Sequence, residues 1–136
     1  GYAAFAATMT IARLTGDSVI SRFGAIRVLA VGSVFASVGI AFSLCSSSWL
    51  LALLGYAMVG AGCANIVPVL FTAVARQTDM PQASAVPAMT TLGYAGVLIG
   101  PAFIGFVAHA SSLIVALAFV AVALLIVAAF SRSIRV

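Results

Sequence analysis

Charged side chains are scarce in this sequence. Its 136 residues include six basic and two acidic side chains, so that 6% are charged and 65% are hydrophobic. In soluble domains about a quarter of the residues carry charge. The mean hydropathy of +1.31 is also far above that of a soluble domain. This composition excludes an ordinary soluble fold and predicts a protein whose partner is the lipid bilayer.

Lysine is absent, and all six basic residues are arginine. The net charge of +4 and the isoelectric point near 9.8 would by themselves suggest a nucleic-acid partner. The arginines, however, occur singly or in pairs between apolar runs and form no basic stripe. This pattern orients a membrane protein and does not build a phosphate-binding face. We therefore expect no nucleic acid among the partners.

Groups that carry chemistry are also sparse. Cys45 and Cys63 are expected at different membrane depths, so they predict no disulfide and serve as small apolar fillers. Asp17 and Asp79 both fall in predicted loops and form no catalytic carboxylate pair. The sequence has no Ser-His-Asp or Cys-His set, no metal-ligand cluster and no glycine-rich loop after a strand. We therefore expect that the protein is not an enzyme and that it binds no metal ion and no cofactor.

Five long apolar segments make up most of the sequence. A helix needs about 20 residues to cross about 30 Å of hydrocarbon, and each segment is near or above that length. The first begins GYAAFAATMTIA, without an initiator methionine or a polar flank, so we expect the chain to start inside a spanning helix as a fragment of a longer protein. The fold class predicted is an all-α polytopic membrane protein with transmembrane helices at approximately 1–20, 25–44, 49–75, 83–108 and 113–130.

The charges alternate between successive loops. The second and fourth loops carry no Arg, Lys, Asp or Glu, whereas the first loop, the third loop and the end of the chain carry Arg22, Arg27, Arg76, Arg132 and Arg135. By the positive-inside rule, these positions and the C-terminus face the cytoplasm across a bacterial-type cell membrane. Arg13 is expected about two turns below the cytoplasmic end of its helix, where it can reach the interface or pair with Asp17.

The stretch RLTGDSVISRFGAIRVL, residues 13–29, resembles the cytoplasmic loop signature of the major facilitator superfamily, G-x-x-x-D-R-x-G-R/K-R/K. Arg22, Phe23 and Gly24 match its R-x-G core, and Arg27 supplies the basic residue that follows. Asp17 occupies the first glycine position and Ser21 the acidic one. This departure resembles the second copy of the motif, in the C-terminal half. The later segments GYAMVGAGCANIVPVLFTAVARQ and GYAGVLIGPAFIGF also resemble helices of that half.

The resemblance implies that the chain is helices eight to twelve of a twelve-helix permease, part of one six-helix half. Such a secondary active transporter moves a small solute across the cytoplasmic membrane by alternating access between two bundles. The partners implied are the solute, a proton as a candidate coupling ion, and the missing N-terminal half. The alternative is a non-transporting membrane subunit or packing module that binds a partner helix.

The resemblance also implies a role for the charged loop. In the family this loop contacts neighbouring helix ends and steadies one of the two access states, a role that would involve Arg13, Asp17, Arg22, Gly24 and Arg27. Arginines beside helix C-termini are attracted to the negative end of the helix dipole, and that contact can be broken as the helices rock. The competing interpretation is a topology anchor that any polytopic protein could have.

The third segment holds an amide at the expected depth of the membrane interior. Asn65 shares a helical face with Met58. Pro68 lacks an N–H and so frees the carbonyl of Ala64. A side-chain amide beside loosened backbone is suited to contact a substrate, as in transporters with interrupted helices. Equally, Asn65 could bond a neighbouring helix while Pro68 only kinks its own.

The fourth segment combines small residues with hydroxyls. Gly93, Gly96 and Gly100 form a stripe on which another helix could pack closely, the use we expect for them. Pro101 is expected to bend the helix by freeing the carbonyl of Val97. Three side chains at similar depth are candidates for the substrate pathway or for interhelical hydrogen bonds: Thr90, Thr91 and Tyr94.

The last two features are the histidine at the end of the fourth segment and the apolar fifth segment. His109 falls at the outer end of the fourth segment with no acidic residue on that side, so we expect an interfacial histidine and no proton-coupling role. The fifth segment, 113–130, has no polar residue and suits a lipid-facing helix, as the family's twelfth helix is.

Overall fold

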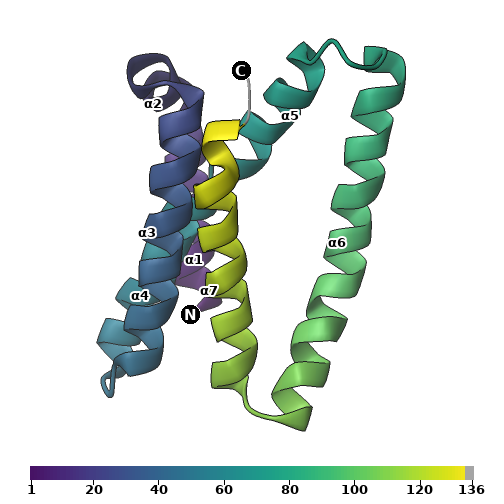
Figure 1. Ribbon diagram of the computed structural model, residues 1–136. Coiled ribbons are helices and arrows are strands. Elements are labelled where there is room, and N and C mark those ends of the chain that lie inside the picture. The colour runs from purple at the N-terminus through teal and green to yellow at the C-terminus, as the bar shows by residue number, and fades with distance from the viewer. Residues whose placement is uncertain (134–136) are drawn as a thin grey trace.

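The structure, a computed structural model, describes residues 1–133, and these residues form helices without strands. The fold class is therefore all-α, as predicted, while Arg135 lies outside the described residues. The elements are α1 (Tyr2–Leu14), α2 (Gly16–Phe23), α3 (Ala25–Cys45), α4 (Trp49–Cys63), α5 (Ile66–Arg76), α6 (Gln82–Ala110), α7 (Leu113–Phe130) and the short 3-10 helix η1 (Ser131–Ser133) (Figure 1).

Four helical stretches are long and apolar enough to cross a membrane. They are Ala25–Cys45, Trp49–Arg76, Gln82–Ala110 and Leu113–Ser133, with mean hydropathies between 1.7 and 3.2. The second combines α4 with α5, and the fourth combines α7 with η1. With 13 residues, α1 is about 20 Å long at about 1.5 Å per residue, shorter than a full crossing.

The prediction of one helix over residues 1–20 is wrong, because α1 ends at Leu14 and α2 begins at Gly16. Most of the loop expected between the first two segments is therefore helical and forms α2, which lies at the end of the bundle (Figure 1). Glycine favours a helix end over a helix interior. In α2, Val19 and Phe23 lie four residues apart on one face, with polar residues on the other, a pattern suited to an interface.

The third segment also differs from its prediction. A single helix over 49–75 was expected, but the helix is interrupted at Ala64 and Asn65 and resumes at Ile66. Pro68 accounts for the interruption, since its ring nitrogen cannot donate to the carbonyl four residues earlier. Asn65 then precedes α5 with φ −103° and ψ 0°, outside regular helical geometry.

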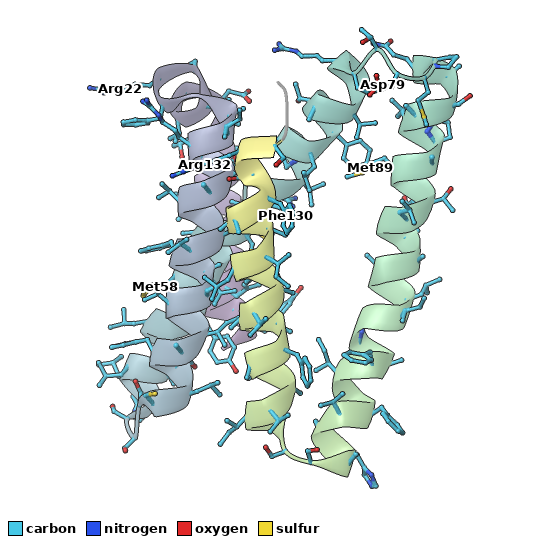
Figure 2. All side chains as sticks on the ribbon, in the orientation of Figure 1. Arg22, Met58, Asp79, Met89, Phe130 and Arg132 are labelled. Carbon is cyan, nitrogen blue, oxygen red and sulfur yellow. The ribbon has the colours of Figure 1, made fainter. Side chains whose placement is uncertain are left out.

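The helices pack around α3, which contacts both α4 and α7. Helix α1 lies against α4, while α6 contacts only α5 and α7 among the described elements. Figure 1 shows α6 set apart along most of its length. Arg22, Asp79 and Arg132 lie toward the same end of the bundle (Figure 2), which we call the basic end. The uncharged turns after α3 and α6 lie at the opposite end, so charge alternates as the sequence predicts.

Glycines hold α3 and α4 in close contact. A Cβ atom on Gly32 would lie 2.6 Å from the carbonyl oxygen of Gly62, and one on Gly39 would lie 2.7 Å from that of Gly55. Both pairs are therefore backbone-to-backbone contacts that no larger residue fits. In lipid, where burial of apolar surface drives little association, such packing is a main source of helix–helix stability.

A serine hydroxyl links α3 to α7. Ser37 Oγ lies 2.9 Å from the carbonyl oxygen of Ala121 on α7 and 3.0 Å from that of Ser33 one turn earlier on α3. Ser33 is itself fully buried, and its Oγ has no hydrogen-bond partner within the described part of the chain. The two serines therefore offer a matched pair, one with an interhelical bond and one without.

We expect Ser37→Ala to destabilise the full-length protein by about 0.6 kcal/mol, and by no more than about 1.7 kcal/mol, which is the range of interhelical hydrogen bonds in membranes. Ser33→Ala should be neutral or stabilising, because it removes a buried hydroxyl without a partner. Denaturant unfolding of the purified protein measures both changes. A larger loss for Ser33→Ala than for Ser37→Ala would contradict this assignment.

Candidate functional site

The interrupted helix between α4 and α5 is the most distinctive polar feature of the bundle. The carbonyl of Ala64, freed by Pro68, accepts a hydrogen bond of 3.3 Å from Nε of Arg13 on α1. Ala64 is fully buried. The freed carbonyl follows from the sequence, but its partner does not, because Arg13 is 51 residues away along the chain.

The position of Arg13 corrects one expectation. Arg13 lies in the last turn of α1, next to the end of the helix, and not two turns below it. Asp17 is not the partner used, since the guanidinium donates to the Ala64 carbonyl at the end of α4. The reason is the early end of α1, which brings the last turn beside the break in the neighbouring helix. Arg13 is exposed, and its reach to the membrane interface stays a prediction.

Asn65 lies beside Gly16, the first residue of α2. A Cβ on Gly16 would overlap Asn65 Oδ1, so a larger residue there would require the Asn65 side chain to rotate away. The amide also lines an open hollow of about 510 Å³ between α1 and α3, toward the basic end. Its other lining residues are mostly apolar, with two exceptions: Thr15 and Arg27. Asn65 thus groups with the charged loop and the end of α1.

The remaining pathway candidates lie elsewhere. Met58 lines a second hollow between α3 and α7, together with Leu125 and Arg132 (Figure 2). This hollow adjoins the first one at Val31 and Phe35, which line both. On α6, Thr90 Oγ1 and Thr91 Oγ1 each donate to a carbonyl of their own helix at 2.9 Å, those of Val86 and Pro87. Tyr94 is 68% exposed. Residues 1–133 therefore do not bring these candidates together with Asn65, and their role as a pathway stays a prediction.

The glycine stripe of α6 meets no neighbour in the described residues. Nothing lies within 4 Å of a Cβ built at Gly93, Gly96 or Gly100. Helix α6 also continues through Pro101, so any bend there does not end it. Packing of this stripe stays a prediction for an element beyond residues 1–133. The glycines that do pack closely, on α3 and α4, were missed, although each helix repeats glycine at a spacing of seven residues, a pattern visible in the sequence.

The loop residues of the R-x-G core have clear local roles. Gly24 joins α2 to α3 at φ +85°, and it is the sole residue with positive φ among those described. Any other residue would be strained there. The guanidinium of Arg22 lies 5.8 Å from the centre of the Phe23 ring, a cation–π contact. Arg27 lies in the first turn of α3 and points to the hollow that Asn65 also lines.

Curated relatives match almost the whole chain. An uncharacterized MFS-type transporter of Yersinia pestis is 48% identical over 134 residues, which are 98% of this chain. The chain belongs to the major facilitator superfamily. Membrane protein MosC of Rhizobium meliloti is 34% identical over 96% of the chain, and the uncharacterized transporter y4wD of Sinorhizobium fredii is 28% identical over 83%.

This superfamily member spans about a third of the length of these relatives, with shares of 35%, 32% and 30%. That share is what a C-terminal fragment of a longer MFS-type transporter would have, as the loop signature indicates. No protein-family model matches the chain. No solved structure matches it either.

Proposed function

We propose that the complete protein is a secondary active transporter that moves a small solute across a bacterial cytoplasmic membrane by alternating access. This chain would supply helices eight to twelve, with the basic end and the C-terminus in the cytoplasm. A proton is the candidate coupling ion. The names of the relatives and the match of 98% of this chain to an MFS-type transporter support the class. The placement of charge at one end supports the orientation.

The single observation that carries a mechanism is the hydrogen bond from Arg13 to the Ala64 carbonyl. It joins the end of one helix to the break in another, where the backbone is held by fewer bonds of its own. Such a link can be made and broken as α1 and the α4–α5 helix tilt against each other. Broken helices with free backbone groups are also where transporters build their binding sites. We assign the Ala64–Asn65 break to the moving part of the transport cycle.

The charged loop would assist this motion. Arg13, Arg22 and Arg76 each occupy the last turn of a helix, namely α1, α2 and α5. Arginine in a last turn complements the negative end of the helix dipole. Asp17 occupies the first turn of α2, where the dipole favours an acidic side chain. These contacts would stabilise one arrangement of the basic end, the role that the loop signature implies.

The complete reading frame provides the first test. We expect it to encode a seventh helix upstream of Gly1, preceded by six more and by a better copy of the charged-loop signature. The full-length protein in proteoliposomes should then exchange at least one labelled solute from a panel in a counterflow assay. A frame that encodes only these five helices would contradict the proposal. Stable binding of a partner helix without any flux would support the alternative of a non-transporting subunit.

Asn65 offers a residue-level test. We expect Asn65→Ala in the full-length protein to lower the initial rate of uptake about tenfold and the folded yield much less, since the amide lies at the break and beside Gly16. Uptake in proteoliposomes and the monodisperse yield after purification measure the two effects. Thr72→Ala, an exposed hydroxyl on α5 that bonds only its own helix, is the control. Equal losses of uptake and yield for Asn65→Ala would indicate packing instead.

A further inference from the structure

An apolar groove runs along the outside of the bundle at the basic end. Its walls are α1 and α3, which do not contact each other, and its floor is α4. Helix α2 covers its end with Val19 and Phe23. The largest wall side chains are open to the surroundings, with Val31 67% and Phe35 43% exposed. In a membrane, these side chains need an apolar occupant.

The length of the groove fits one leaflet. Its α3 wall extends from Arg27 to Phe35, about 12 Å at about 1.5 Å per residue. One leaflet contributes about 15 Å of hydrocarbon. The groove therefore begins near the headgroup level of the basic end and ends near the bilayer centre. Its volume of about 510 Å³ is that of an ordinary small-molecule site.

The headgroup end of the groove is positively charged. Arg27 lines both the groove and an adjoining hollow of about 420 Å³, which Arg76 also lines. Both arginines are exposed. No acidic residue lines either hollow. Guanidinium groups bind phosphate oxygens with paired, charge-assisted hydrogen bonds.

We propose that this groove binds one anionic phospholipid, with its phosphate held by Arg27 and Arg76 and one acyl chain lying between α1 and α3. The apolar wall selects a lipid over a free phosphate, and the two arginines select an anionic headgroup over a zwitterionic one. The cytoplasmic leaflet, where the positive-inside rule places this end, is the leaflet rich in anionic lipid. The proposal requires only that the chain spans a membrane and does not depend on transport.

Native mass spectrometry of the purified full-length protein tests the headgroup. The probes are phosphatidylglycerol and phosphatidylcholine with identical acyl chains. We expect about fivefold tighter binding of phosphatidylglycerol per contributing arginine. Arg27→Gln and Arg76→Gln should each reduce that preference about fivefold. Arg22→Gln, at the same end but outside both hollows, should not change it. Equal binding of the two lipids by the wild type would overturn the proposal.

Two further variants test the acyl chain. Ala12→Phe should fill the groove and weaken binding of both lipids, whereas Ile11→Phe on the exposed face of α1 should weaken neither. Should Ala12→Phe fail to fold, Val31→Asn places an amide on the exposed wall and should have the same effect on binding. Unchanged binding in the folded groove variant would overturn the proposal. So would displacement of phosphatidylglycerol by excess inorganic phosphate, which would indicate an anion site only.

Discussion

Replacing Gly39 with leucine is expected to lower the free energy of unfolding of the full-length protein by about 3 kcal/mol, the upper end of typical overpacking costs. A Cβ at this position would lie 2.7 Å from the Gly55 carbonyl oxygen and 2.8 Å from Cβ of Met58. Backbone atoms on α4 cannot rotate away, so α3 and α4 would have to separate. Such a loss corresponds to about a hundredfold change in the folding equilibrium. Denaturant unfolding and folded yield measure it.

Gly105→Leu is the matched control. Nothing lies within 4 Å of a Cβ at Gly105, and α6 there is an ordinary helix. Leucine is the better helix former by up to about 1 kcal/mol, so the control should be neutral or stabilising. Gly39→Ala should fall between the two, since it adds only the first atom of the clash. Wild-type stability of Gly39→Leu would mean that α3 and α4 are not in backbone contact.

Replacing Arg13 with methionine is expected to reduce the rate of solute uptake by tenfold or more. Methionine keeps a long flexible side chain but cannot donate to the Ala64 carbonyl, which would be left buried without its partner. A hydrogen bond to a charged group contributes about 1.5–3 kcal/mol, which is about tenfold to a hundredfold in a conformational equilibrium. Counterflow in proteoliposomes measures the rate, and yield after purification measures folding.

Two variants separate the hydrogen bond from the charge. Arg13→Lys retains the charge and a donor, and should restore part of the rate. Arg22→Met removes an equal charge from the same loop and should have a smaller effect. The Arg22 guanidinium lies over the adjacent Phe23 ring and makes no hydrogen bond within residues 1–133. If Arg22→Met reduced uptake as much as Arg13→Met, net charge at the basic end would matter and the link to the broken helix would not.

The sequence predicts the apolar segments and the alternation of charge because both depend on solvation along the chain. A charged side chain in hydrocarbon costs about 2.5–3.5 kcal/mol on insertion scales, so Arg76 and Arg132 must lie near loops wherever their helices pack. Pro68 likewise loosens its own helix by local chemistry alone, and the break appears where the freed carbonyl of Ala64 was expected. These features need no knowledge of the neighbours.

The partners of each polar group depend on the packing of distant segments, and the sequence predicts them poorly. Arg13 could reach the interface or Asp17, and it takes the Ala64 carbonyl because α1 ends early beside α4. Gly16 lies against the amide of Asn65, a contact between residues 49 positions apart along the chain. The predicted packing stripe on α6 rested on one four-residue step, from Gly96 to Gly100. The glycine contacts observed between α3 and α4 follow a seven-residue repeat instead, as at Gly32 and Gly39.

Site-directed labelling of single cysteines tests most directly the claim that the arginines mark the cytoplasmic face of a multi-pass carrier. In the full-length protein, Cys45 and Cys63 would first be replaced by alanine, and cysteine placed at Ser47 or at Thr78, which lie in turns at opposite ends of the bundle. An impermeant maleimide should label Ser47→Cys in intact cells and Thr78→Cys only after the membrane is permeabilised. Labelling of both positions from the same side would contradict the threading and, with it, the carrier assignment.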